Sequence, residues 1–420
     1  MYKYVIHGRK KLSGEVTISG SKNASLPIMA ASILTDERVT LQNVPDLMDI
    51  ATMKELLTLL GKKVSGSGGS VIIEETDPAP YEAPYDICRK MRASIAVMGP
   101  LLARKKKAKI SFPGGCAIGP RPIDLHITGM KSLGAELRIE HGYIWAEAGE
   151  LTGKKINLLG NSGPSVGATE NVMSAAVLAK GITVIEGAAC EPEIENLADF
   201  LTGMGAKIRG AGTTTIVIEG VEKLHGTSHE IIPDRIETGT FIAAAGITGG
   251  EIHLKKVNAS HLEKPIEVLS LAGVEIEILS NDHIIARGNN IKPVEVDTRP
   301  YPFFPTDLQA QLMALLCVSE GISIITEKIF PDRFMHAAEL CRMGADIKVD
   351  GAIAVIKGVP VLSGASVMAS DLRAGAGLVI GALRANGKSE ILRIYHLDRG
   401  YERLEEKLKN LGADIERLTQ

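Results

Sequence analysis

A helical pattern that ends in glycine recurs six times along the chain and limits the folds that the chain can adopt. Each copy is an amphipathic segment followed by a short strand, as in MKELLTLLGKKV and EEKLKNLGADI. The glycines lie 68 to 73 residues apart, at Gly61, Gly134, Gly205, Gly273, Gly344 and Gly412. Self-similarity at a nearly fixed period indicates a repeat architecture. Six such units fill the 420 residues from end to end.

The last copy shows how each unit is expected to pack. Leu404, Leu408 and Leu411 are spaced i, i+4, i+7 and form one apolar stripe on a helix. Gly412 supplies the left-handed residue that commonly ends a helix, and ADIERL then predicts a strand. We therefore expect an outer, amphipathic helix followed by a strand in every unit.

A second helix, rich in small residues, precedes each amphipathic helix. Examples are ATENVMSAAVLAKGITVIEG and AGAGLVIGALRANGKSEILRI. Alanine and glycine on several faces indicate a helix that is buried all round. Each unit is thus predicted to run strand, buried helix, strand, amphipathic helix, strand, which is an α/β fold.

The length of the chain favours two globules of three units each. The predicted divide lies around residues 221–235, and the first strand is expected to close the second globule. The domains are then residues 21–230, and residues 1–20 together with 231–420. The chain would cross twice between the globules and leave an interdomain cleft.

Composition excludes several classes of partner. A net charge of −3 and 23% charged residues give no support to a nucleic-acid or membrane partner. The five cysteines are odd in number and form no C-x-x-C pair, which favours reduced thiols over a disulfide frame or a metal site. Because no apolar signal segment opens the sequence, we expect a cytoplasmic protein. Three cysteines in apolar helical contexts are predicted to lie in the core: Cys88, Cys317 and Cys341.

Residues 112–122, F-P-G-G-C-A-I-G-P-R-P, are predicted to form a loop because three glycines and three prolines cannot sustain a helix or a central strand. The loop carries Cys116 and Arg121, and a basic run precedes it at residues 104–107. A thiol on a loop near positive charge is the setting in which cysteine becomes reactive. The alternative is a surface loop with an incidental cysteine.

Polar clusters open the helices that are rich in small residues. They are Ser21-Lys22-Asn23, Arg89 to Arg92, Ser165 to Thr169, Asp234-Arg235, Thr306-Asp307 and Asp371 to Arg373. Singly, such residues are usually caps or solvated charges, and Asp307 could be a cap or a general base. Their repetition favours an anionic ligand at the helix N-termini, with Lys22, Arg92, Arg121, Arg373 and Arg399 along one cleft.

Ten stretches together carry a specific likeness. They are GSKNASLP (20–27), MRASI (91–95), PGGCAIGPRPIDLH (113–126), SVGAT (165–169), EPEI (191–194), PDRIETGT (233–240), FPTDLQAQ (304–311), DRFMHAAEL (332–340), SDLRAGAGLVI (370–380) and IYHLDRGYE (394–402). On these the chain resembles the UDP-N-acetylglucosamine enolpyruvyl transferase family over its full length. The resemblance implies a two-domain, inside-out α/β barrel of six βαβαββ repeats, three per domain.

The resemblance also implies an activity. Family members transfer the enolpyruvyl group of phosphoenolpyruvate to the 3′-hydroxyl of UDP-N-acetylglucosamine and release phosphate. This is the first committed step of peptidoglycan synthesis, and so bears on cell shape and cell division. No metal and no organic cofactor is implied, the partners are the two small-molecule substrates, and no oligomeric state is implied.

Catalytic roles follow residue by residue from the same likeness. Lys22, Arg121 and Arg399 would hold the phosphate and carboxylate of phosphoenolpyruvate. Cys116 would protonate C3 or form a covalent adduct, and would be the target of the epoxide fosfomycin. Asp307 would accept the proton of the sugar hydroxyl, and the attack needs such an acid and base on opposite sides.

Binding roles follow in the same way. Asn23 would orient both substrates, and Asp371 and Arg373 would support the closed form. The UDP-N-acetylglucosamine site would be lined by Asn23, Arg92, Arg121, Pro122, Ile123, Asp124, Leu125, Ser165, Asp307 and Ile329. The sequence departs from the family's pattern at Gly163-Pro164, where a lysine is common, and at Pro331, where some members carry glutamate.

Three alternatives remain at this point. A sister transferase that acts on shikimate 3-phosphate shares the fold and the Lys, Arg and Asp set, although the Cys116 loop points to the nucleotide sugar. A paralogue could bind UDP-N-acetylglucosamine without turnover. A non-enzymatic repeat scaffold is the competing class, but it leaves the polar helix starts without a purpose.

Overall fold

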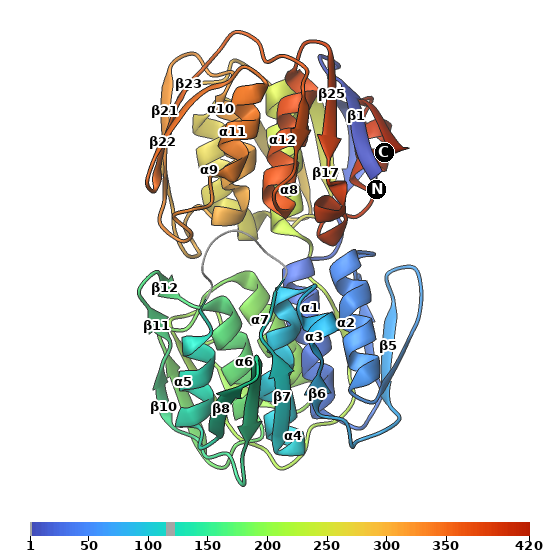
Figure 1. The fold of residues 1–420 in the computed structure, drawn as a ribbon, viewed down its shortest axis with the longest axis vertical. Helices are drawn as coiled ribbons and strands as arrows, with labels where there is room; N and C mark the ends of the chain where they lie inside the picture. Colours follow the sequence, from blue (N-terminus) through green and yellow to red (C-terminus); the bar gives the residue numbers. More distant parts are fainter. Residues whose placement is uncertain (1, 115–121) are drawn as a thin grey trace. The chain divides into compact units, whose positions relative to one another are not determined.

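The structure, a computed structural model, describes residues 2–114 and 122–420, which form two compact units (Figure 1). Unit 1 contains residues 2–19 and 233–420, and unit 2 contains residues 20–114 and 122–232. The chain passes from one unit to the other after Ser19 and returns after Ile232. At the crossing, Asp234 N donates to Ser19 O at 2.9 Å and Ser21 N donates to Ile232 O at 2.7 Å, so the two passing segments run side by side.

Unit 2 is built from three four-stranded sheets around three inner helices. The strands of each sheet are given in hydrogen-bonded order. The first sheet contains β16 (Ser228–Glu230), β3 (Val39–Gln42), β5 (Val71–Glu75) and β4 (Lys62–Ser65). The second contains β6 (Glu82–Ala83), β7 (Lys107–Ser111), β9 (Tyr143–Glu147) and β8 (Glu136–Glu140), and the third contains β10 (Lys155–Asn157), β13 (Ile182–Glu186), β15 (Thr215–Glu219) and β14 (Lys207–Arg209). The inner helices are α1 (Lys22–Ala31) with η1 (Ser32–Leu34), η2 (Arg92–Val97) with α4 (Met98–Lys105), and α6 (Val166–Ala176). The outer helices are α2 (Met48–Leu59), α5 (Asp124–Ser132) and α7 (Pro192–Gly203), and the smaller elements are α3 (Tyr85–Cys88) and the hairpin of β11 (Leu159–Gly160) and β12 (Gly163–Pro164).

Unit 1 repeats this plan. Its sheets are β2 (Ser13–Thr17), β17 (Glu251–Lys255), β19 (His283–Arg287) and β18 (Glu275–Ser280); β20 (Glu295–Thr298), β21 (Ile322–Glu327), β23 (Ile353–Lys357) and β22 (Asp346–Asp350); and β24 (Ser366–Met368), β25 (Lys388–Leu392), β1 (Tyr2–His7) and β26 (Asp414–Thr419). The inner helices are α8 (Arg235–Thr248), η4 (Thr306–Leu308) with α10 (Gln309–Leu316), and α12 (Leu372–Arg384). The outer helices are η3 (Ala259–Leu262) with α9 (Glu263–Leu271), α11 (Met335–Arg342), and η5 (Ile394–Arg399) with α13 (Leu404–Asn410).

All six sheets share one topology, which confirms the prediction of six βαβαββ repeats, three in each unit. The first strand of each sheet is parallel to the second, and the remaining pairs are antiparallel, as β20, β21, β23 and β22 show. Three repeats are completed by strands from elsewhere in the sequence. β1 lies between β25 and β26, β2 takes the first place beside β17, and β16 takes the first place beside β3.

The inner helices are buried all round, as their small residues predict, and the sheets lie outside them (Figure 1). Every residue of α8 and α10 is buried. Gly377 of α12 faces Ala310 of α10 so closely that an added Cβ would lie 2.7 Å from the Ala310 carbonyl oxygen. Small side chains therefore set the spacing of the inner helices.

The six repeat glycines end the outer helices as predicted. Their φ angles lie between +87° and +101°, the region in which only glycine avoids strain. The stripe of Leu404, Leu408 and Leu411 is buried. Amphipathic periodicity and a glycine stop thus define the same element in all six repeats.

The cysteine prediction is partly wrong. Cys88 and Cys317 are buried, but Cys341 is exposed. It lies on α11, an outer helix with one face in solvent, and the apolar residues around it belong to the other face. Across residues 2–114 and 122–420, no helix is long and apolar enough to cross a membrane.

Candidate active site

In unit 2, candidate residues lie where the inner helices begin. Lys22 and Asn23 are the first two residues of α1, and Arg92 opens η2. Ser165 is the N-cap of α6, where its side chain accepts from Ala168 N at 3.3 Å. Backbone N–H groups that point out of helix N-termini favour anions, so these positions suit phosphate or carboxylate groups.

Lys22 is held by a buried carboxylate that sequence reasoning did not identify. Its Nζ lies 3.3 Å from Oδ2 of Asp49, which is only 3% exposed and lies in the first turn of α2. A lysine on a flexible stem loses rotamer freedom when a fixed partner holds its end. The contact with Asp49 therefore restricts the position of the Lys22 ammonium group.

Arg92 reaches the segment that follows the cysteine loop. Its Nη2 donates to the Pro122 carbonyl oxygen at 3.4 Å, just before α5 begins at Asp124. Ile123 is buried, while Pro122 and Asp124 are exposed. The contact connects the Arg92 guanidinium to the backbone of residues 122–125, which are predicted to bind the nucleotide sugar.

Leu125 packs near the hairpin of β11 and β12. A Cβ added at Gly160 of β11 would lie 3.1 Å from Leu125 Cδ1, and β12 consists of Gly163 and Pro164. The first departure from the family's pattern is therefore built into this hairpin.

Cys116 and Arg121 lie outside the described residues. The predicted roles of the thiol and of this guanidinium remain predictions from the sequence.

A group of buried carboxylates lies in α6 and at the start of α7. Burial raises the pKa of Glu170 well above its usual range, and the neighbouring Glu193 and Glu191 raise it further. Glu191 and Glu193 belong to the EPEI stretch. Burial and the two neighbouring carboxylates therefore favour the protonated form of Glu170, on the helix that Ser165 caps.

In unit 1, Asp307 is held by two buried arginines. Its Oδ1 accepts from Arg333 Nη1 at 2.8 Å, and its Oδ2 accepts from Arg373 Nη2 at 3.0 Å and Nε at 3.2 Å. The side chains of Arg333 and Arg373 are 7% and 3% exposed, and that of Asp307 is 26% exposed. The two guanidinium groups donate to both carboxylate oxygens and so fix their orientation.

A second network connects Asp307 to the loop of Ile329. Arg333 Nη1 also donates to Thr306 Oγ1 at 3.0 Å, and Thr306 Oγ1 donates to Glu327 Oε2 at 2.9 Å. The other oxygen of Glu327, which is fully buried, accepts from the backbone N of Ile329 at 2.9 Å. Ile329 and Asp307, both predicted to meet the nucleotide sugar, thus belong to one hydrogen-bonded group.

Asp371 is the N-cap of α12. Its Oδ1 accepts from Arg373 N at 2.9 Å and Ala374 N at 3.1 Å, as an N-cap does. Although burial disfavours the charged guanidinium, the Asp307 carboxylate raises the pKa of Arg373 above its usual value. Burial lowers the pKa of the neighbouring His336 to about 4; Asp371 opposes this shift and Arg333 adds to it. His336 is therefore neutral at pH 7 and does not compete for Asp371.

Arg399 ends η5, which packs against the N-terminal part of α12. The backbone of Gly400 approaches Leu372 so closely that a Cβ there would lie 2.5 Å from Leu372 Cδ2. Burial lowers the pKa of His396, and Arg399 lowers it further while Asp371 opposes the shift. Arg399 and Asp371 are thus near the same imidazole, so Arg399 lies at the same end of unit 1 as Asp307.

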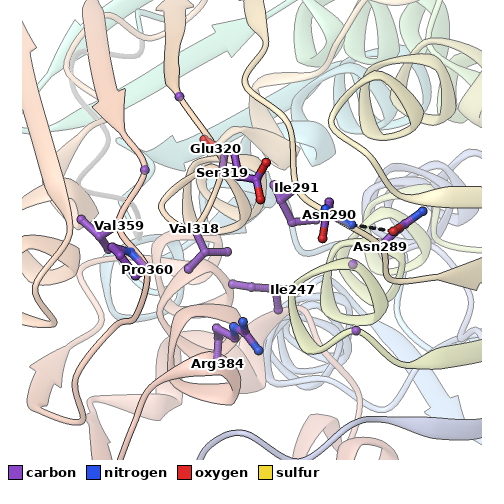
Figure 2. A pocket seen from close by; sticks show the side chains of 14 residues that line it. Ile247, Asn289, Asn290, Ile291, Val318, Ser319, Glu320, Val359, Pro360 and Arg384 are labelled. Atoms are coloured by element: carbon purple, nitrogen blue, oxygen red, sulfur yellow. Dashed lines mark hydrogen bonds between the residues drawn. The ribbon is translucent and has the colours of Figure 1, made fainter.

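A separate pocket of unit 1 lies away from this site. A pocket of about 460 Å³ lies at the opposite ends of the same inner helices, between the C-termini of α8, α10 and α12 (Figure 2). Ile247, Val318, Ser319 and Arg384 line it (Figure 2). Arg373 and Arg384 stand near the two ends of α12, and a helix of 13 residues is about 20 Å long. The pocket and the Asp307 network are therefore separate.

Comparisons with known proteins agree with this fold. The family model described as EPSP synthase (3-phosphoshikimate 1-carboxyvinyltransferase) matches residues 6–408. The crystal structure of the enolpyruvyl transferase NikO from Streptomyces tendae has a TM-score of 0.91 and 26% identity, and covers 100% of this chain and 99% of that one. EPSP synthase from Acinetobacter baumannii has a TM-score of 0.76 at 18% identity over both complete chains, which shows the fold alone. The class is that of the carboxyvinyl transferases.

Curated relatives narrow this class. The UDP-N-acetylglucosamine 1-carboxyvinyltransferase 2 of Carboxydothermus hydrogenoformans is 54% identical over 421 residues, and the UDP-N-acetylglucosamine 1-carboxyvinyltransferase of Desulfosudis oleivorans is 52% identical over 419 residues. In both comparisons the alignment covers 100% of each chain. The chain belongs to the UDP-N-acetylglucosamine 1-carboxyvinyltransferase family, which confirms the resemblance read from its motifs.

Sequence reasoning missed the residues that hold the candidates in place. Asp49, Glu327 and Arg333 are not close in sequence to the groups that they contact, apart from the short link of Glu327 to Ile329. A signal for Arg333 was present, because it lies in the matched stretch DRFMHAAEL. No spacing rule identifies Asp49, which reads as an ordinary first-turn acid of α2.

Proposed function

We propose that this chain transfers the 1-carboxyvinyl group of phosphoenolpyruvate to the 3′-hydroxyl of UDP-N-acetylglucosamine and releases phosphate. The observation that carries the proposal is an identity of more than one half, over complete chains, with enzymes named for this reaction. We propose further that the reaction takes place in the cytoplasm and is the first committed step of peptidoglycan synthesis.

The residues support an addition followed by an elimination. In the addition, the sugar oxygen bonds to C2 of phosphoenolpyruvate, Asp307 takes the hydroxyl proton, and Cys116 delivers a proton to C3. In the elimination, the C2–O bond to phosphate breaks and C3 loses a proton, which restores the double bond. Asp307 suits the role of base because two guanidinium groups hold its carboxylate in a fixed orientation.

Anion binding is assigned to three cationic side chains. Lys22, Arg121 and Arg399 hold the phosphate and carboxylate of phosphoenolpyruvate. Converging lysine and arginine side chains stabilise the negative charge that moves to the leaving phosphate. The Asp49 contact supports this role for Lys22, because it fixes the ammonium at the N-terminus of α1.

The nucleotide sugar is bound by the residues that the resemblance assigns to it. They are Asn23, Arg92, Arg121, Pro122, Ile123, Asp124, Leu125, Ser165, Asp307 and Ile329. Asp371 and Arg373 support the form that reacts. The contacts of Arg92 with Pro122 and of Ile329 with Glu327 support a preformed backbone at two of these places.

A phosphate-release assay tests the proposed function. With both phosphoenolpyruvate and UDP-N-acetylglucosamine present, we expect continuous release of inorganic phosphate, and no release when either is omitted. Release with shikimate 3-phosphate in place of the nucleotide sugar would assign the chain to the sister reaction instead. Binding of UDP-N-acetylglucosamine without any release would identify a paralogue that has lost turnover.

Replacing Cys116 by alanine is expected to abolish covalent labelling by fosfomycin, an epoxide. The thiolate is the nucleophilic form of cysteine, and the candidate loop supplies one thiol. Intact-protein mass spectrometry measures the label. Cys190→Ala is the matched control, because burial raises the pKa of Cys190 and Glu191 raises it further, which disfavours its thiolate form. Full labelling of Cys116→Ala would place the reactive thiol elsewhere.

A further inference from the structure

A buried tyrosine lies beside Asp307 and its arginine. Tyr401 is 2% exposed, and its hydroxyl lies 2.8 Å from Thr240 Oγ1 and 3.0 Å from Gln311 Nε2. The same Gln311 nitrogen lies 3.0 Å from the backbone carbonyl oxygen of Asp307. Thr240, Gln311 and Tyr401 come from three different repeats of unit 1, which gives α8, α10 and the turn after η5 one shared polar group.

The direction of each hydrogen bond in this group follows from the acceptors at its two ends. Thr240 Oγ1 lies 2.8 Å from the Ile236 carbonyl oxygen, which can only accept, so the threonine proton is used there. The Tyr401 hydroxyl must then donate to Thr240. At the other end, the Asp307 carbonyl can only accept, so the Gln311 amide nitrogen faces it.

Gln311 completes the chain of bonds. One of its two amide protons goes to the Asp307 carbonyl oxygen, and the other goes to the Tyr401 oxygen at 3.0 Å. Its third contact, with Thr240 at 3.2 Å, is longer and has no proton left. The hydrogen bonds therefore run without a conflict of donors from Gln311 through Tyr401 and Thr240 to the backbone of α8.

A second link joins Tyr401 to the carboxylate itself. The guanidinium carbon of Arg373 lies 5.5 Å from the centroid of the Tyr401 ring, within the range of a cation–π contact. Arg373 donates through Nε and Nη2 to Asp307 Oδ2. Burial raises the pKa of Tyr401, so the hydroxyl keeps the proton that the chain of bonds requires. Tyr401 is thus linked to Asp307 in two ways. Gln311 connects the Tyr401 hydroxyl to the backbone of Asp307, and Arg373 connects the Tyr401 ring to the carboxylate of Asp307.

From this arrangement we infer that Tyr401 is a positioning residue for the reaction: its hydroxyl, anchored by Thr240 and Gln311, fixes Arg373 and the backbone of Asp307 so that the carboxylate meets the sugar hydroxyl. The inference rests on the proposed function, because it assigns to Asp307 the role of base. Tyr401 touches no reacting atom in this scheme. Its effect is on the alignment of Asp307, and misplacement of a reacting group by about 1 Å can cost about 100-fold in rate.

The test compares Tyr401→Phe and Thr240→Val with Thr240→Ser. Phe keeps the ring beneath Arg373 and removes only the hydroxyl, and Val removes the acceptor that this hydroxyl needs. We expect each to lower kcat by roughly 10- to 100-fold while the KM values for both substrates stay within about twofold. Thr240→Ser keeps the hydroxyl and is expected to keep kcat. The double variant should be no slower than either single one, because both break the same chain of bonds.

The pH profile separates positioning from a general loss of stability. With Arg373 less well aligned, the Asp307 carboxylate is less stabilised, so the acid limb of the kcat profile should move to higher pH in Tyr401→Phe. Tyr4→Phe is the matched control: Tyr4 is a buried tyrosine of the same unit whose hydroxyl donates to Glu405 at 2.6 Å. It should lose stability and keep both kcat and the profile.

Two results would overturn the inference. The first is an unchanged kcat and pH profile in Tyr401→Phe, and the second is an equal fall of kcat in Tyr4→Phe. Failure of the proposed function is recognised separately, because the wild-type chain would then release no phosphate from phosphoenolpyruvate and UDP-N-acetylglucosamine in the same assay.

Discussion

Asp307→Asn is expected to lower kcat by about 1,000-fold, within the range that a general base contributes. The amide is close to the carboxylate in shape but cannot take the proton of the sugar hydroxyl. It also leaves Arg333 and Arg373 buried without the charge that compensates them. Removing one partner of a buried ion pair costs about 3–5 kcal/mol, so we expect a large loss of unfolding free energy as well. Phosphate release and urea unfolding measure the two effects.

Asp297→Asn is the matched control for this substitution. Asp297 also lies between two cations of unit 1, at 2.7 Å from Arg299 and 2.5 Å from Lys328, but those side chains are 46% and 47% exposed. Exposed pairs contribute about 0–1 kcal/mol, so this variant should be nearly as stable and as active as the wild type. A kcat of Asp307→Asn within tenfold of the wild-type value would contradict the assignment of Asp307 as the base.

Lys407→Met is expected to destabilise the chain by about 3–5 kcal/mol at neutral pH. Lys407 Nζ lies 2.6 Å from Oε1 of Glu237, which is 2% exposed. The other carboxylate oxygen accepts from Ser19 N at 2.7 Å, at the last residue of unit 1 before the chain crosses. Without Lys407, the buried Glu237 carboxylate keeps the Ser19 backbone N–H of these two partners but loses the compensating positive charge.

The loss in Lys407→Met should shrink at acid pH. Burial raises the pKa of Glu237, while Lys407 lowers it, so its removal raises the pKa further. A carboxyl group whose pKa is higher in the folded state binds more protons there, so stability falls as pH rises through the window above its unfolded value of about 4.3. Urea unfolding at about pH 5 and about pH 7.5 should show the larger loss at the higher pH.

Lys409→Met provides the control on the same helix, because Lys409 is exposed on α13. It should change the unfolding free energy by less than about 0.5 kcal/mol at either pH. An equal loss for the two lysines, or a loss in Lys407→Met that does not depend on pH, would mean that Glu237 is not compensated by Lys407.

The repeat architecture could be predicted from the sequence because its signals are local. A glycine with positive φ ends each outer helix, and the apolar stripe that precedes it lies within three turns. The inner helices show their burial in their own composition, as α8 and α12 do. Cys341 was misplaced because an apolar context does not say which face of an outer helix a residue occupies.

Of the candidate site, only the residues at the N-termini of the inner helices could be predicted from the sequence. Lys22 and Asp307 stand where an inner helix begins, and their charge at that place is visible in the sequence. Their partners could not be read in the same way. Asp49 lies 27 residues from Lys22, and Arg373 lies 66 residues from Asp307, so these pairs exist only after the repeats have packed. The hydroxyl chain of Thr240, Gln311 and Tyr401 depends on three repeats for the same reason.

The nature of the nucleotide-sugar product tests the central claim most directly. The chain is incubated with phosphoenolpyruvate and UDP-N-acetylglucosamine, and the sugar nucleotide is then isolated and analysed by mass spectrometry and proton NMR. We expect a product heavier by one carboxyvinyl group, with vinyl protons and a link at the 3′-oxygen of the sugar, and one phosphate released for each product formed. Recovery of unchanged UDP-N-acetylglucosamine, with the carboxyvinyl group transferred to shikimate 3-phosphate in a parallel reaction, would contradict the claim.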